Sequence, residues 1–132
     1  MNQEKGNWMP GGSDMEQRIA EHDEMNRYIK SQLSGRDVLE ALAEEAAELS
    51  QAALKMIRAC RLGGTNNVTP VTPEEATDNL LEEMADVELV MDVLSHYICC
   101  GKALNNIKGE KRERWVSRLK ELEEKWKGGK NE

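Results

Sequence analysis

Two matching stretches decide the fold: LAEEAAEL at residues 42–49 and LLEEMADV at residues 80–87. Position by position, each has an apolar pair, two acids, two small or apolar residues, a further acid and an aliphatic residue. Because Ala, Leu, Met and Glu favour helix, each stretch predicts a helix that carries carboxylates three positions apart. A carboxylate beside a buried face is unfavourable unless it is paired or binds a cation. The two stretches therefore predict an oxygen-lined metal site between two helices.

The composition is that of a small helical protein. The chain has 132 residues, of which 39% are apolar, 33% are charged and only 4% are aromatic, with no Phe. This predicts one all-α domain with solvated outer faces. The net charge of −7 argues against a nucleic-acid polymer as partner, because phosphates would be repelled. Three cysteines without a disulfide framework, no apolar run of about 18 residues and no signal peptide indicate a cytoplasmic protein without a membrane span.

Caps and helix breakers divide the chain into a bundle of about four helices. Capping patterns begin at Ser13, Ser34 and Thr72, and a linker rich in Gly and Pro occupies residues 63–73. We expect an irregular N-terminal arm at 1–12, a single domain at 13–127 and a frayed tail at 128–132. The predicted helices span residues 14–32, 36–61, 73–98 and 110–127, with a turn or short helical piece at 102–109. No β-type alternation is present, so no sheet is predicted.

A helical wheel separates the acids of the two stretches. In the second helix the predicted buried face consists of Leu42, Ala46, Leu49, Ala53, Met56 and Cys60. Glu45 lies roughly 60° and Glu48 roughly 120° from the centre of this face, and Glu44 points away. In the third helix the corresponding face consists of Leu80, Met84, Val87, Met91, Leu94 and Ile98. Glu83 and Asp86 hold the positions of Glu45 and Glu48, while Glu82 points outward.

Packed antiparallel, the two helices would bring four carboxylates together. Such a cluster repels itself and takes up protons unless a cation is present. Oxygen ligands select hard ions such as Mg²⁺ or Mn²⁺. Because Mg²⁺ commonly bridges carboxylates to substrate phosphates, the pattern indicates cleavage of a phosphate ester or phosphoanhydride by a metal-activated water.

The pattern Glu44-Glu45-x-x-Glu48 followed by Glu83-x-x-Asp86 resembles the signature of the MazG-like, all-α nucleoside triphosphate pyrophosphohydrolases. This superfamily includes the dimeric dUTPases and dCTPases. The resemblance covers the second and third helices, about half of the chain. It implies a hydrolase that converts a (d)NTP to the (d)NMP and pyrophosphate by attack of water on the α-phosphorus. It also implies a homodimer or homotetramer in which a second subunit completes the bundle or the nucleotide pocket.

The resemblance assigns roles to individual residues. The implied Mg²⁺ ligands, for which Mn²⁺ may substitute, are Glu45, Glu48, Glu83 and Asp86. Glu44 would be a further ligand or would hold the attacking water, so the implied catalytic acids are Glu44, Glu45 and Glu48. Family members often place a Lys and an Arg after the second motif, and Lys111 and Arg114 are the counterparts here, with Lys102 and Asn106 as alternatives. The Asn that many members carry between that Lys and Arg is absent from this chain.

Other interpretations remain open on the sequence. Lys111 and Arg114 also fit a solvated helix with Glu partners. Base-stacking candidates are Trp8, His22 and Tyr28, whereas Trp115 and Trp126 have the spacing of core or interface residues. The alternative functions are a non-catalytic helical interaction protein and a family member that binds nucleotides without turnover. A zinc site at His96, Cys99 and Cys100 and a di-iron site are disfavoured, because neither CxxC pairs nor Glu-x-x-His motifs occur.

Overall fold

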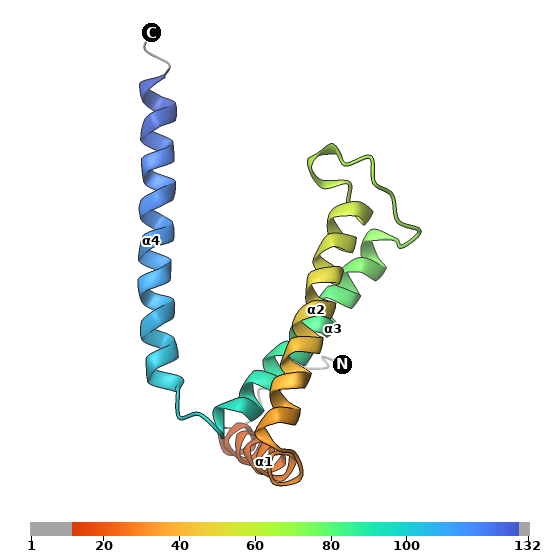
Figure 1. The fold of residues 1–132 in the computed structure, drawn as a ribbon, viewed down its shortest axis with the longest axis vertical. Coiled ribbons are helices and arrows are strands. Elements are labelled where there is room, and N and C mark those ends of the chain that lie inside the picture. The colour runs from red at the N-terminus through yellow and green to blue at the C-terminus, as the bar shows by residue number, and fades with distance from the viewer. Residues whose placement is uncertain (1–11, 130–132) are drawn as a thin grey trace, which may run out of the picture. The chain divides into compact units, whose positions relative to one another are not determined.

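The computed structural model describes residues 12–129, which are helical throughout except for short connections and contain no strand. The elements are α1 (Gly12–Gln32), α2 (Gly35–Ala59), the short 3-10 helix η1 (Leu62–Gly64), α3 (Pro73–Ser95) and α4 (Gly101–Gly128), as Figure 1 shows. The all-α prediction with four main helices is confirmed. The predicted arm at 1–12 lies outside the described residues except for Gly12, and the predicted tail lies outside them from residue 130 onward.

The chain divides into two compact units, Met1–Tyr97 and Ile98–Glu132, which are described separately. Of the described helices, the first unit contains α1, α2, η1 and α3, and the second contains α4. The single domain expected at 13–127 stays a prediction. Among the described residues, no helix combines the length and apolar character needed to cross a membrane.

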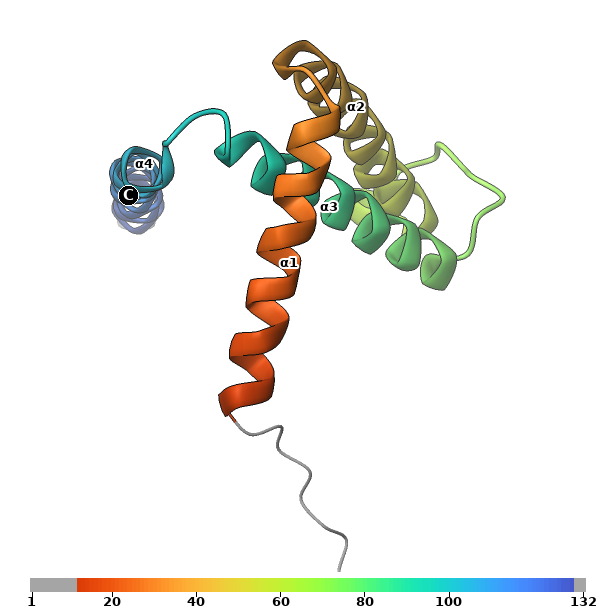
Figure 2. The ribbon, with the colours of Figure 1, turned by 90° about the horizontal axis from the view of Figure 1, so that it is seen from below.

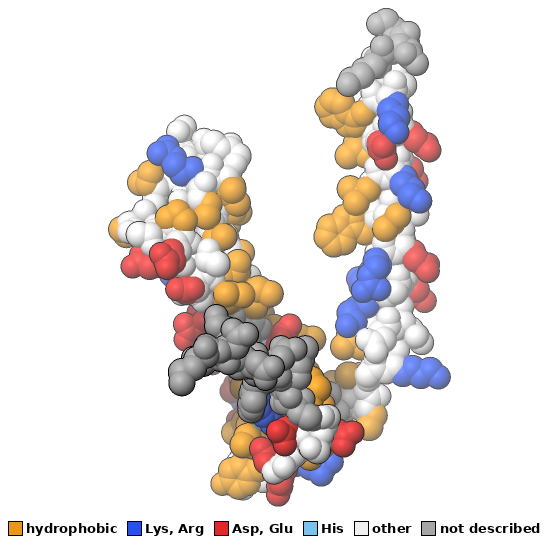
Figure 3. Space-filling view, turned by 180° about the vertical axis from the view of Figure 1, so that it is seen from behind, with side chains coloured by type: hydrophobic (Ala, Val, Ile, Leu, Met, Phe, Trp, Pro, Cys, Tyr) orange, Lys and Arg blue, Asp and Glu red, His pale blue; other side chains and the backbone are white. Residues whose placement is uncertain are grey.

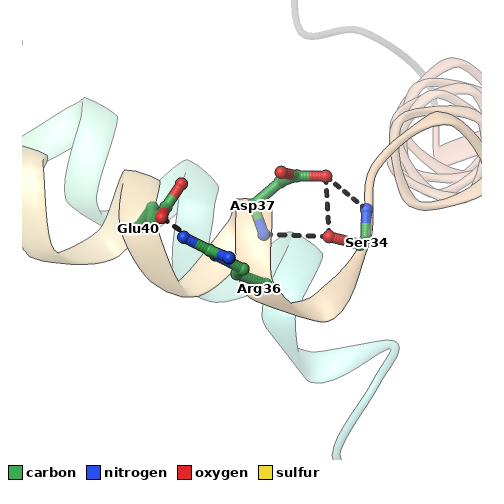
Figure 4. Close-up of polar contacts among 4 residues, drawn as sticks. All are labelled: Ser34, Arg36, Asp37 and Glu40. Carbon is green, nitrogen blue, oxygen red and sulfur yellow. Dashed lines mark hydrogen bonds and ion pairs between the residues drawn. The ribbon is translucent and has the colours of Figure 1, made fainter.

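Helices α2 and α3 begin at capping boxes. The Ser34 hydroxyl accepts a hydrogen bond from the Asp37 amide at 3.1 Å, and the Asp37 carboxylate accepts one from the Ser34 amide at 2.7 Å (Figure 4). Thr72 and Glu75 form the same reciprocal pair at 3.2 and 2.9 Å, followed by Pro73 at the start of the helix. These bonds satisfy amides that lack a partner in the first turn. Both predicted caps are confirmed.

The helix ends differ from the prediction in several places. Helix α1 begins at Gly12, so Ser13 lies inside the helix and is not its cap. Helix α2 ends at Ala59, and Arg61 already has a left-handed backbone with φ of 52°. Gly63 and Gly64 also have positive φ, a conformation that suits glycine and turns the chain towards α3.

Helix α3 ends at Ser95, three residues before the predicted end, and α4 begins at Gly101, well before the predicted start at Glu110. The segment 102–109 is therefore part of α4 and not a separate turn. The physical reason is that its one interior glycine, Gly109, disfavours helix by only about 1 kcal/mol relative to Ala. The continuous helical hydrogen bonds on both sides of Gly109 outweigh this unfavourable helix propensity.

Helices α2 and α3 lie side by side and antiparallel, and they form the core of the first unit (Figures 1 and 2). The buried apolar residues among those described are Val38 and Ala52 on α2 and Ala76 and Val93 on α3. The small alanines allow the two helices to approach closely. The protein thus has a narrow core built along one helix pair.

The side of each helix that faces this core is rotated from the one predicted from the wheel. As predicted, part of that side is half-buried, namely Leu42, Leu49, Met56, Cys60, Leu80, Val87 and Leu94. On α2, Ala46 and Ala53 are exposed, whereas Ala52 is buried. On α3, Met84 is 44% exposed and Met91 is 43% exposed. Compared with the prediction, both helices are therefore rotated about their axes so that Glu45 and Glu83 lie closer to the core. The small residues Ala52 and Ala76 pack better than Met where the two helices approach each other most closely.

Helix α1 crosses α3 and is held at its C-terminal end (Figure 2). The Lys30 ammonium donates to the carbonyl of His96 at 2.6 Å and lies 5.1 Å from the centre of the Tyr97 ring. The Tyr97 hydroxyl reaches the carbonyls of Lys30 and Leu33, which lie at the end of α1. The His96 imidazole is 3.6 Å from the Asp23 carboxylate. This anchor holds the end of α1 against the residues that follow α3.

Candidate metal centre

The acids of both motifs lie in line with the buried core residues. Glu45 is seven positions after buried Val38 and seven before buried Ala52. On α3, Glu83 follows buried Ala76 by seven positions, and Asp86 precedes buried Val93 by seven. Seven residues are close to two helical turns, so residues at this spacing share a face. The acids therefore occupy the middle of the α2–α3 contact, with apolar layers towards both ends.

Three of the predicted acids converge there. Glu45 from α2 and Glu83 and Asp86 from α3 each offer a carboxylate oxygen, and these oxygens lie within 4.8 Å of one another. All three residues are half-buried. Oxygens at this separation from two helices can coordinate a single cation, because one ion of the Mg²⁺ or Ca²⁺ class binds oxygens at about 2.0–2.6 Å.

Among the described residues of its own unit, the cluster has no cationic partner. Within residues 12–97, no Lys or Arg forms an ion pair with Glu45, Glu48, Glu83 or Asp86. Glu83 Oε2 is buried and has no hydrogen-bond partner. A buried carboxylate oxygen without a donor is unfavourable, and a cation would satisfy it. Within residues 12–97 the charges of these acids are therefore not balanced by an ion-paired Lys or Arg.

The environment of the cluster raises the pKa of two of its members. For Glu45 the main cause is partial burial, followed by the nearby charges of Asp86, Glu48 and Glu44. For Glu83 burial again comes first and raises the pKa, followed by Glu48, Asp86 and Glu45. Both causes penalise the ionised form. A bound divalent cation would oppose both, so the donor set fits such an ion.

Glu48 and Glu44 stand at the edge of the cluster. Glu48 is exposed, but its charge acts on the pKa of both Glu45 and Glu83, which places it beside them. Glu44 is exposed and is the last of the charges that raise the pKa of Glu45. The structure thus brings together three of the four predicted ligands, with Glu48 at the rim and Glu44 farther out. Their catalytic roles stay predictions.

The predicted cationic residues belong to the other unit. Lys111 and Arg114 are exposed on α4 and line a shallow groove of that helix together with Arg118. Among the base-stacking candidates, His22 and Tyr28 are exposed on α1, and Trp8 lies outside the described residues. A role of these residues in binding a nucleotide stays a prediction.

One feature of the site was missed by the wheel, namely how centrally Glu45 and Glu83 lie in the contact. The signal was present in the sequence as the seven-residue spacing of Val38, Glu45 and Ala52. The wheel did not show it because Leu and Met are more hydrophobic than Ala. The predicted centre of the buried face was therefore placed on these larger residues and not on the observed line of contact.

Comparison with known proteins adds no relative: no protein-family model, no curated protein and no solved structure gives a significant match to this chain. What the molecule itself shows is an all-α fold with an acidic cluster, suited to a metal ion, between α2 and α3. The resemblance to the MazG-like enzymes rests on the two sequence motifs.

Proposed function

We propose that this protein is a Mg²⁺-dependent nucleoside triphosphate pyrophosphohydrolase, which cleaves a (d)NTP to the (d)NMP and pyrophosphate. The observation that carries the proposal is the convergence of Glu45, Glu83 and Asp86 within 4.8 Å, with Glu83 Oε2 buried and without a partner. The chemistry of this donor set suits a hard divalent cation. The order and spacing of the two motifs supply the reaction type.

In this proposal Glu45, Glu83 and Asp86 hold the cation, and Glu48 completes the set from the rim. When bound, Mg²⁺ supplies neutralisation of phosphate charge and acidification of a water molecule. The oxygen of water forms a bond to the α-phosphorus, and the bond from that phosphorus to the oxygen bridging to the β-phosphate breaks. Glu44 or Glu48 accepts the proton of the water at a carboxylate oxygen, and pyrophosphate leaves with the bridging oxygen.

Product analysis tests the reaction. The chain is incubated with standard and modified (d)NTPs and Mg²⁺, and the products are separated by anion-exchange chromatography. We expect equal amounts of monophosphate and pyrophosphate. In H₂¹⁸O the label should enter the monophosphate, since water attacks the α-phosphorus. Label in pyrophosphate, release of orthophosphate, or no turnover of any nucleotide would contradict the proposal.

A matched pair of variants ties the activity to the cluster. Glu83→Gln removes a charge at the centre, and Glu82→Gln removes one from the exposed neighbour on the outer face. We expect Glu83→Gln to lower turnover at least about 100-fold, because changes to groups that merely support metal ligands already cost 10–100-fold. Glu82→Gln should retain activity. Equal activities of the two variants would show that the cluster is not the site.

Metal binding is measured separately from turnover. Titration of free Mn²⁺ by electron paramagnetic resonance should show a site in the wild type and in Glu82→Gln, and a much weaker one in Glu83→Gln. The melting temperature should rise with Mg²⁺ or Mn²⁺, because a ligand of the native state stabilises it. Binding of Mn²⁺ and of a nucleotide without hydrolysis would instead favour a nucleotide-binding protein without turnover.

A further inference from the structure

Helix α4 carries an apolar stripe along its C-terminal half that its own unit cannot bury. The stripe consists of Trp115, Leu119, Leu122 and Trp126, which are 69%, 56%, 53% and 70% exposed. Figure 3 shows hydrophobic side chains gathered on one side of this part of the helix. The second unit contains no other helix among its described residues. A patch with two exposed tryptophans at helical spacing marks an interaction surface.

The spacing of the stripe is that of a helix that pairs with another helix. Successive members are separated by four, three and four positions, which is the a/d alternation of a heptad. Trp115 and Leu122 take the d positions, and Leu119 and Trp126 take the a positions. One heptad earlier the corresponding positions are Lys108 and Arg112, so the apolar seam is confined to the C-terminal half of α4.

One pair of opposite charges beside the stripe, Arg118 and Glu123, favours a second copy of α4 that runs in the same direction, while Lys111 falls opposite Val116. One flank, the g positions, carries Lys111, Arg118 and Lys125, and the other flank, the e positions, carries Val116 and Glu123. In a parallel pair the g flank of one helix meets the e flank of the other, so Arg118 of each copy faces Glu123 of the other copy. In an antiparallel pair the g flanks meet, and Lys and Arg would face Lys and Arg.

Glu123 already forms an ion pair with Lys127 of its own helix at 2.8 Å. Both side chains of that pair are well exposed, and such pairs contribute little. It therefore does not compete strongly with a second Arg that approaches Glu123 across a helix interface.

We propose that two copies of this chain associate through a parallel pairing of α4, with Trp115, Leu119, Leu122 and Trp126 at the seam. The two reciprocal Arg118–Glu123 contacts set the direction. The proposal does not rest on the proposed nucleotide chemistry.

Charge exchange on the full-length chain tests both the surface and its direction. Arg118→Glu places Glu opposite Glu123, and Glu123→Arg places Arg opposite Arg118, so each variant alone should raise the dimer dissociation constant about tenfold or more. Mixing the two variants should restore association as a heterodimer. The readout is sedimentation velocity over a range of concentrations. Lys120→Glu is the matched control, since it makes the same charge change on the outer face.

Arg118→Glu also separates the two directions. It weakens a parallel pair, but it relieves the repulsion between g flanks in an antiparallel pair and would tighten it. A second variant, Leu119→Ser with Leu122→Ser, removes half of the seam, and circular dichroism checks that its helix content is retained. We expect this variant to be monomeric where the wild type is dimeric.

Three results would overturn the proposal. The wild type could be monomeric across the accessible concentration range, which includes the case of a stripe that packs within its own chain. A dimer could persist unchanged in the Leu119/Leu122 variant, which would place the interface elsewhere. A tighter dimer of Arg118→Glu would reverse the direction of the helices.

Discussion

Glu83 lies where a carboxylate is unfavourable for the fold. It lies in line with buried Ala76, one of its oxygens has no partner, and Glu45 and Asp86 approach it within 4.8 Å. A leucine at this position would remove both the desolvated charge and the repulsion. A bound cation would offset the cost of placing these acids in the middle of a narrow core.

The raised pKa values of Glu45 and Glu83 predict how stability depends on pH. Their folded-state pKa lies above that of the unfolded chain, so the folded state binds protons more tightly. The free energy of unfolding of the metal-free protein should therefore fall as pH rises from the ordinary glutamate pKa through the raised values. Urea unfolding at a series of pH values, with a chelator present, measures this slope.

Variants and metal provide the controls for that measurement. Glu83→Gln should flatten the fall in stability, whereas Glu82→Gln, which removes a charge from the exposed face, should retain it. Saturating Mg²⁺ should oppose the fall, because only ionised carboxylates bind the ion. A wild type and a Glu83→Gln variant with the same slope would show that Glu83 does not titrate in the folded state as described.

At the scale of single elements, short-range signals place the starts of the two central helices. Each capping box involves only a few consecutive residues, so it can form in almost any tertiary context. The two boxes are Ser34 with Asp37 and Thr72 with Glu75. The Ser34 amide and hydroxyl also lower the pKa of Asp37 by hydrogen bonding to its carboxylate. The caps thus define where α2 and α3 begin, and hence which of their residues can lie opposite one another.

Ser34→Ala tests the contribution of a cap. The variant loses the hydroxyl that accepts from the Asp37 amide, and we expect the free energy of unfolding to fall by about 1 kcal/mol. Ser50→Ala is a suitable control, because that hydroxyl bonds a carbonyl inside α2 and caps nothing. Urea unfolding by circular dichroism measures both. Equal losses in the two variants would mean that the Ser34 cap does not stabilise α2.

At the scale of the whole molecule, the first unit encloses few apolar side chains among its described residues. Its fully enclosed apolar residues in that range are Val38, Ala52, Ala76 and Val93. Small domains with so limited a core usually depend on a metal, a disulfide or association for stability. The three cysteines are free, so they add no disulfide to this stability.

Association predicts that thermal stability depends on protein concentration. If pairing through α4 stabilises the native state, the melting temperature should rise by several degrees over about a hundredfold increase in concentration, by mass action. Differential scanning calorimetry of the wild type and of the Leu119/Leu122 variant checks this expectation. The variant should melt at one temperature throughout. A wild type without concentration dependence would argue that the folded monomer stands alone.

The sequence by itself determined the all-α class, the starts of α2 and α3, and the identity of the acids that could meet. These follow from propensity, caps and spacing, which act over a few residues. Only the tertiary structure decided which side of each helix faces the other. The most hydrophobic line of each helix runs through Leu and Met, but close packing of the two helices favours the line of Val38, Ala52 and Ala76. This rotation of α2 and α3 relative to the prediction brings Glu45 and Glu83 into the contact and leaves Met84 and Met91 exposed. The physical reason is that the side chains at the crossing set the distance between the helix axes, whereas hydrophobicity along each helix does not.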